Sequence, residues 1–143
     1  MKRILFLAIT IAIVSLQQLY AQCDSAFTIT SSQTVYLDSS DNVVRTVDEL
    51  STIRVSKTTV TITPGNSRVM SGPVSKHECK WQVPYKDGRS LIIASLSNEA
   101  AGESRTINML LEAKQGVLSL TATVDGDDNK RIKLSGVKFS TTQ

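Results

Sequence analysis

The feature that most constrains the fold is a period-two alternation of apolar with polar residues. Apolar pairs two positions apart recur along the chain: Phe27 and Ile29, Val35 and Leu37, Ile53 and Val55, Val60 and Ile62. Because successive side chains of a strand point to opposite faces, this pattern predicts strands with one buried face. Val, Ile and Thr make up roughly a quarter of the residues after Ala21, and they favour strands. The fold class expected is all-β.

Clusters of Gly, Pro, Asn and Asp predict the turns between these strands, at residues 38–42, 64–66, 72–73, 84–88, 114–116 and 125–129. We expect about ten strands, at residues 26–30, 33–37, 43–47, 52–56, 58–63, 75–83, 90–96, 105–113, 117–124 and 130–139. In the last strand, Leu134 and Val137 are three apart, which predicts a bulge at Gly136. Residues 47–51 and 98–104 suggest turns or single helical turns, too short to cover a sheet.

Short connections between consecutive strands predict a small antiparallel up-and-down β-barrel. The expected barrel resembles calycin-type barrels such as lipocalins in architecture only, because no motif of that family accompanies it. A two-sheet β-sandwich is the alternative. An immunoglobulin-like sandwich would need longer crossovers and usually a Trp between two cysteines, whereas Trp81 follows Cys79.

The first 21 residues have the pattern of a secretory signal peptide. Lys2 and Arg3 precede an apolar run at residues 4–16, and the small residue Ala21 ends a cleavage site. This run is too short for a membrane-spanning helix, which needs about 20 apolar residues. We therefore expect one domain at residues 22–143, secreted or periplasmic and soluble. A lipid-bearing Cys23 would need a small preceding residue, and Gln22 disfavours it.

The mature chain has two cysteines, Cys23 and Cys79, and export into an oxidising compartment predicts a disulfide between them. The bridge would tie the N-terminal segment to the middle of the chain. The alternative is a reactive thiol beside His77, which would require Cys79 to stay reduced and exposed.

Candidate catalytic and metal-binding residues are few. His77, the one histidine, shares a strand face with Cys79, a spacing that suits a thiol–imidazole pair or two metal ligands. We expect a structural histidine instead, with no metal and no cofactor. Residues 125–129 alternate oxygen ligands but lack the Gly and Glu of a calcium loop, and Glu99 and Glu103 are expected to be solvated. No catalytic motif occurs, so we do not expect an enzyme.

The net charge is +3, from 16 basic and 13 acidic residues, and it is uneven along the chain. Seven basic residues lie near Trp81 and Tyr85: Arg54, Lys57, Arg68, Lys76, Lys80, Lys86 and Arg89. We expect them on solvated outer faces; a site for an anionic polymer or a sugar is the alternative. Without its leader the chain has almost no basic excess, so nucleic acid is not an expected partner.

These features favour a secreted, non-catalytic binding protein whose barrel receives a small apolar ligand. The expected interior residues are Ile107, Met109, Leu111, Leu118, Leu120, Ile132 and Leu134. The ligand-binding candidates are Met109, Leu111 and Leu120, together with Trp81 and Tyr85 near one mouth; a completely filled barrel is equally consistent with them. One alternative is a protein-interaction module, such as an inhibitor of a secreted protease that uses the loop at residues 97–104. An enzyme is the least favoured alternative.

The leader and the cysteines generate the first prediction. Exported protein should begin near Gln22, carry no lipid and lack free thiols, because cleavage follows Ala21 and the two cysteines pair. Intact-mass analysis with and without alkylation measures all three properties. A lipid-sized mass increment, or alkylation without prior reduction, would contradict the assignment.

Overall fold

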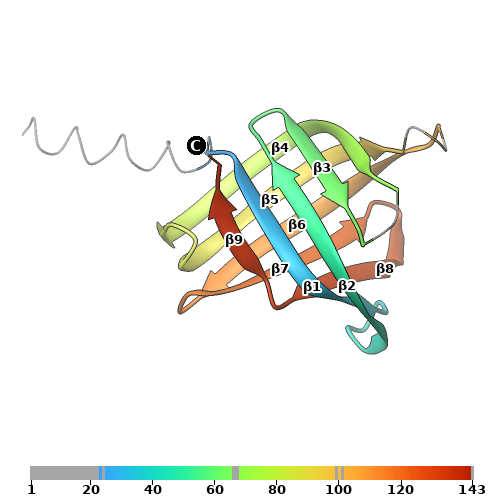
Figure 1. Ribbon diagram of the computed structural model, residues 1–143, viewed down its shortest axis with the longest axis horizontal. Helices are drawn as coiled ribbons and strands as arrows, with labels where there is room; N and C mark the ends of the chain where they lie inside the picture. The colour runs from blue at the N-terminus through green and yellow to red at the C-terminus, as the bar shows by residue number, and fades with distance from the viewer. Residues whose placement is uncertain (1–22, 24, 66–67, 99, 101, 143) are drawn as a thin grey trace, which may run out of the picture.

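The computed structural model describes residues 23, 25–65, 68–98, 100 and 102–142 (Figure 1). The expected signal peptide lies outside these residues. The described residues form nine strands and no helix: β1 (Phe27–Leu37), β2 (Val43–Val55), β3 (Thr59–Thr63), β4 (Met70–Val83), β5 (Asp87–Ser97), β6 (Ser104–Lys114), β7 (Val117–Val124), β8 (Asp127–Ser135) and β9 (Lys138–Thr141). No helix able to cross a membrane is found among them. The all-β prediction is confirmed.

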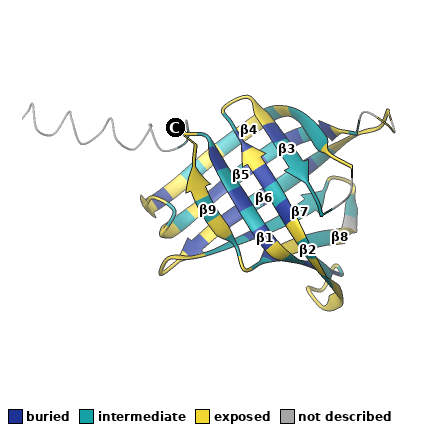
Figure 2. Ribbon diagram, viewed as in Figure 1, coloured by how far each residue is buried: buried dark blue, intermediate teal, exposed yellow. Residues whose placement is uncertain are grey.

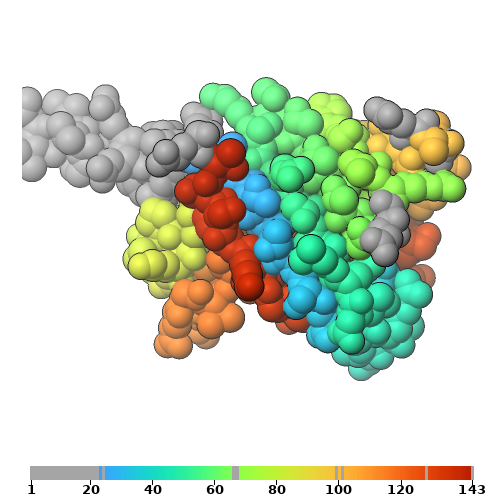
Figure 3. All heavy atoms as spheres, viewed as in Figure 1, coloured from blue at the N-terminus to red at the C-terminus, as the bar shows by residue number. Residues whose placement is uncertain are grey.

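The strands close into an eight-stranded antiparallel barrel. Each of β1 to β8 pairs with its neighbours in the sequence, and β1 pairs with both β2 and β8 to close the sheet. β9 follows β8 along the same edge of β1: β8 pairs with the second half of β1, and β9 pairs with the first half. Figure 3 shows β9, in red, lying against this part of β1, in blue. The predicted up-and-down barrel is confirmed, and the sandwich alternative is excluded.

The predicted alternation determines which side chains form the core (Figure 2). On β6 and β7, Met109, Leu111 and Leu120 are buried, and Leu118 and Ala122 are partly buried against the same core. Burying an aliphatic side chain of this size stabilises the fold by about 1.5–3 kcal/mol relative to leaving it exposed. The predicted faces of these two strands are therefore correct.

Two pairs of predicted strands are each one longer strand. β1 covers both segments expected at residues 26–30 and 33–37, and β2 covers both segments expected at 43–47 and 52–56. The helical turn predicted at residues 47–51 is wrong. Val47 pairs with Thr34 and Ser51 pairs with Ser31, so pairing with β1 keeps this stretch extended despite its weak strand propensity.

The turn predicted at Gly72 and Pro73 is also wrong, because both residues lie within β4. A Cβ atom at Gly72 would lie 1.8 Å from the backbone oxygen of Ser95 on β5. Gly72 therefore permits a close approach between two strands, and it does not reverse the chain.

The break predicted at Gly136 is present, but it is not a one-residue bulge relative to β1. Thr30 pairs with Lys138 and Gln33 pairs with Ser135, so both partners advance by three residues across the break. Gly136 has a positive φ of 61°, which suits glycine. The buried hydroxyl of Ser31 lies within hydrogen-bond distance of the backbone oxygens of Gln33 (2.8 Å) and Ser135. This hydroxyl satisfies backbone groups where the ladder is interrupted.

The register of β7 generates a matched pair of substitutions. Leu120 is 1% exposed between Leu111 and Leu134, whereas Thr121 projects to the opposite face of the strand. Leu120→Asp should unfold the domain, because an unpaired carboxylate in this core costs several kcal/mol. Thr121→Asp should change the free energy of unfolding by less than about 1 kcal/mol. Urea unfolding followed by circular dichroism tests both, and equal midpoints would refute the register.

Candidate functional site

The two ends of the barrel differ in what fills them. The β2–β3, β4–β5 and β6–β7 connections lie at one end, together with Cys23 and the C-terminal residues; we call this the closed end (Figure 1). The backbone N–H of Thr142 donates to the oxygen of Ala26 at 3.0 Å, which joins the two terminal segments there. The β1–β2, β3–β4, β5–β6 and β7–β8 connections lie at the other end, which we call the open end.

Four aromatic rings pack together at the closed end. The Tyr85 ring centroid lies 4.1 Å from that of Phe139, 5.1 Å from that of Trp81 and 5.8 Å from that of Phe27. Trp81 is buried, and Tyr85 is partly buried, with the pKa of its phenol raised by that burial. Stacked and tilted rings at these separations attract one another beyond simple area burial. The cluster closes this end of the barrel.

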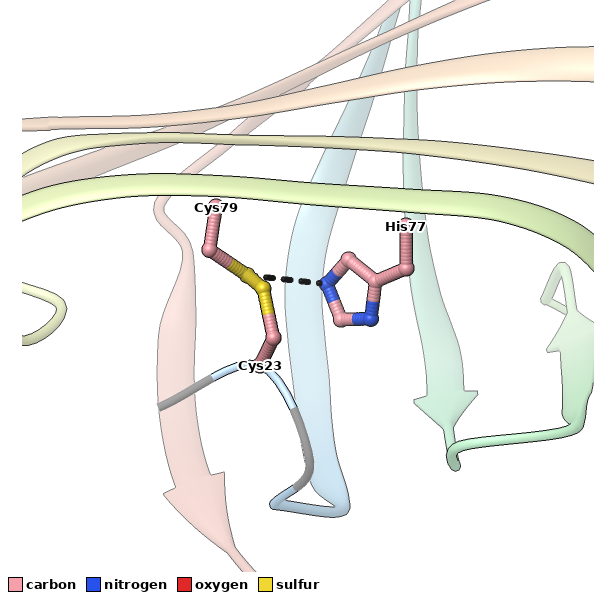
Figure 4. A group of neighbouring side chains, drawn as sticks. All are labelled: Cys23, His77 and Cys79. Carbon is pink, nitrogen blue, oxygen red and sulfur yellow. Dashed lines mark hydrogen bonds between the residues drawn. A yellow bond between two sulfur atoms is a disulfide. The ribbon is translucent and has the colours of Figure 1, made fainter. Parts of the chain in front are cut away.

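Figure 4 shows the Cys23–Cys79 disulfide beside His77; the Ser90 hydroxyl links the disulfide to Trp81 of the aromatic cluster. It joins residues 56 positions apart, and the predicted pairing is confirmed. The Nε2 atom of His77 is 3.4 Å from the Cys79 sulfur, and the Ser90 hydroxyl donates to the same sulfur at 3.1 Å. The indole N–H of Trp81 donates to the Ser90 hydroxyl at 3.2 Å. A connected polar group therefore lies in the closed half of the barrel, beside the aromatic cluster.

The open end contains a cavity of about 180 Å³. Aliphatic side chains make up much of its wall: Ile53, Ile62, Met70, Ile107, Leu120, Ala122, Val124, Ile132 and Leu134. The rest of the lining supplies three hydroxyl groups, the ring of Tyr36 with its phenol, and a proline: Thr34, Ser51, Thr123, Tyr36 and Pro64. Among the described residues of the lining, Glu49 is the charged one. The interior of this half is therefore partly hollow.

The five residues predicted to bind a ligand lie in different parts of the barrel and do not form one site. Leu120 lines the open-end cavity, whereas Met109 and Leu111 are fully buried and do not line it. Trp81 and Tyr85 lie at the closed end. The alternation of the sequence indicates which side chains point inward, but it carries no signal for which end of a barrel they occupy. Ile107, Ile132 and Leu134, which are among the expected interior residues, do line the cavity, whereas the lining residues on β2, β3 and β4 are not predicted as a site.

The seven basic residues of the middle segment are all exposed. Lys76 forms an ion pair with Glu78 at 2.8 Å. Lys80 and Arg89 border a wide outer depression of about 490 Å³, whose lining also includes Asp87 and Glu112. The lining carries charges of both signs, so the depression does not present a uniformly basic surface to an anionic polymer.

The acidic candidates are engaged in local ion pairs. Asp127 pairs with Lys130 at 2.7 Å, and the Lys130 ammonium lowers the pKa of this carboxyl. Glu103 pairs with Arg105 at 3.2 Å, and Glu99 lies outside the described residues. Within the described part of the chain, the one group of three ligands close enough to share a metal ion is Cys23, His77 and Cys79. Asp125 and Asp127 are not part of it, and the turn predicted at residues 125–129 is shorter than expected because β8 begins at Asp127.

Comparisons of the chain with protein families, with characterised proteins and with solved structures found no match. The function of the chain must therefore be inferred from the contents of the two barrel ends.

The disulfide generates a stability prediction. The double variant Cys23→Ala/Cys79→Ala should lose up to about 4 kcal/mol of unfolding free energy, because the unfolded chain regains the entropy of a 56-residue loop. Urea unfolding of the oxidised protein, with and without a reductant, provides the comparison. Reduction should lower the wild-type midpoint and leave that of the variant unchanged. Identical midpoints for oxidised and reduced wild type would contradict a stabilising bridge.

Proposed function

We propose that this protein is an exported, non-catalytic binding protein that holds a small apolar ligand in the open-end cavity. The observation that carries the proposal is the cavity itself, a space of about 180 Å³ with mostly aliphatic walls inside a closed sheet. Binding sites for small molecules are typically concave, largely apolar and supplied with a few polar groups. Thr34, Tyr36 and Ser51 supply such groups here.

The volume limits the size of the ligand. Drug-sized ligands occupy pockets of about 300–1,000 Å³, whereas an apolar cavity of about 150 Å³ admits benzene. The open-end cavity therefore suits a single ring or a short aliphatic chain. A ligand of so few atoms buries little surface, so we expect dissociation constants in the micromolar to millimolar range.

Glu49 limits the charge of the ligand. Its carboxylate lies close to Gly65, where a Cβ atom would be 2.7 Å from Oε2, so the charge sits beside the β3–β4 connection at the open end. The lining contains no Lys, Arg or His among the described residues. A neutral or cationic ligand complements this arrangement, and an anionic one is repelled.

The location of His77 supports a non-catalytic role. It is the one histidine of the chain and lies in the closed half, outside the cavity lining. An imidazole in that position cannot act as a general base on a ligand held at the open end, because proton transfer needs hydrogen-bond distance.

A protein-interaction module is the second candidate, and one observation favours it. Residues 43–51 of β2 pair with β1, but on their other edge no described strand pairs with them. Val43, Val44 and Leu50 are each more than 60% exposed along this stretch. An unpaired strand edge with apolar side chains can accept a strand from a partner protein.

Binding of matched aromatic probes tests the leading proposal. Benzyl alcohol and benzylamine should bind saturably, as followed by two-dimensional NMR, and benzoate should bind at least tenfold more weakly because of Glu49. Ala122→Leu should abolish binding, because it fills the cavity from a lining position. Thr121→Leu is the control, since its side chain projects outward and should leave binding unchanged.

Two results would refute the cavity as a ligand site: no saturable binding by any of the probes, or binding that Ala122→Leu leaves intact. The first result would favour the protein-interaction module. Thermal melting of both variants verifies that the comparison is made between folded proteins.

A further inference from the structure

Ser90, His77 and the Cys23–Cys79 disulfide form a polar group beside apolar side chains in the closed half of the barrel. The inward positions of β5 are Ser90, Ile92, Ala94 and Leu96, and Ser90 is the polar one among them, at 1% exposed. Its hydroxyl contacts the Cys79 sulfur at 3.1 Å and lies 3.5 Å from Nε2 of His77. Two sulfurs, an imidazole and a hydroxyl therefore converge on one interior point.

We infer that Cys23, His77 and Cys79 form a Zn²⁺ site when the disulfide is reduced by a dithiol. Thiolate sulfur and imidazole nitrogen are the ligands that zinc prefers, and two Cys with one His leave a fourth position for water. The site is separate from the open-end cavity, and it does not depend on the proposed ligand-binding function.

The distances between the ligand atoms fit this ion. Zinc bonds to sulfur at about 2.3 Å and to nitrogen at about 2.0–2.1 Å, so tetrahedral ligands lie roughly 3.5–3.8 Å apart. Nε2 of His77 is already 3.4 Å from the Cys79 sulfur, and all three ligand atoms lie within 4.8 Å of one another.

To complete the site, the Cys23 side chain must move. Once the S–S bond is cleaved, the two sulfurs must separate to about 3.8 Å. Cys23 precedes β1, which begins at Phe27, so its side chain can move without displacing a strand. His77 and Cys79 are held on β4, and Ser90 on β5 is placed to donate a hydrogen bond to the Cys79 thiolate. The strands therefore prearrange two of the three ligands.

The chemistry balances in two steps. The dithiol is oxidised to its cyclic disulfide, and the Cys23–Cys79 bond accepts two electrons and two protons to become two thiols. Zn²⁺ then displaces both protons, which pass to solvent, and the two thiolates neutralise the ion.

The metal would replace the covalent link with a coordinate one. Both states tie the N-terminal segment to β4, so zinc should restore stability that reduction removes, through preferential binding to the folded state. A cation held between these side chains would thus preserve the closed end under reducing conditions.

The test uses reduced full-length protein freed of reductant under anaerobic conditions. Titration with Co²⁺ should give the intense ultraviolet absorption of cobalt–thiolate bonds, and Zn²⁺ should abolish it at one equivalent. Reduced wild type should bind at least tenfold more tightly than oxidised protein. His77→Gln should weaken binding of Zn²⁺ at least tenfold.

Glu78→Gln is the matched control, because Glu78 lies between the two ligands in sequence, is exposed and pairs with Lys76. It should bind Zn²⁺ as wild type does. Equal affinity of wild type and His77→Gln, or of the reduced and oxidised proteins, would overturn the site.

A second measurement keeps the test decisive if His77→Gln does not fold. The chain has one histidine, so the NMR signals of its imidazole are assigned without ambiguity. Zn²⁺ should shift them in reduced wild type and leave them unchanged in oxidised protein. Unshifted signals in the reduced protein would equally refute coordination by His77.

Discussion

Closure of the sheet through β1 is the constraint on which the rest of the structure depends. β1 pairs with β2 along one edge and with β8 and then β9 along the other, so its backbone groups are engaged on both sides. An open sheet would leave two unpaired edges and no enclosed interior. The pairing of β1 with β8 and β9 keeps its register across the break at Gly136, because both chains advance by three residues there. The Ser31 hydroxyl lies beside the backbone oxygens of Gln33 and Ser135 at this break. Without that match, the inward faces of β1 and β9 could not both contribute to one core.

Closure encloses an interior, and side-chain size then decides how it is filled. At the closed end, the large rings of Phe27, Trp81 and Tyr85 meet and fill the interior around them. At the open end, the lining includes small residues, among them Thr34, Ser51 and Ala122, and a cavity of about 180 Å³ remains between them and the aliphatic side chains around them. One barrel thus has a packed half, which supports the fold, and a partly hollow half, which is the proposed ligand site. The same alternation of apolar and polar residues produces both halves, and the halves differ in the volumes of their inward side chains.

This division explains how much can be predicted from the sequence. Alternation identifies the inward faces of β6 and β7, because facing is a local property of a strand. The disulfide is predictable because two cysteines allow one pairing. Sequence reasoning divides β2 in two because Val47 to Ser51 has weak strand propensity, and only its pairing with β1 shows that it is extended. Gly72 resembles a turn residue until the backbone oxygen of Ser95 is placed against it. A hollow interior is one of the two outcomes that the sequence allows, but the position of the cavity escapes prediction, because it depends on which strands face each other across the barrel and on their stagger.

The two halves also separate the chemistry of the molecule. The sulfur and imidazole group lies with the aromatic cluster, whereas Glu49 and the cavity lie at the other end, and none of Cys23, His77 and Cys79 lines the cavity. A change in the oxidation state of the cysteines acts first on the segment before β1 and on β4. The cavity walls come largely from the opposite ends of the strands, and the packed residues between, such as Ile92 and Met109, are fully buried. Densely packed cores change arrangement cooperatively and resist small displacements, so a local exchange at the closed end can leave the cavity in place. The sulfur and imidazole groups and the cavity therefore lie at opposite ends of one barrel, with the packed core between them.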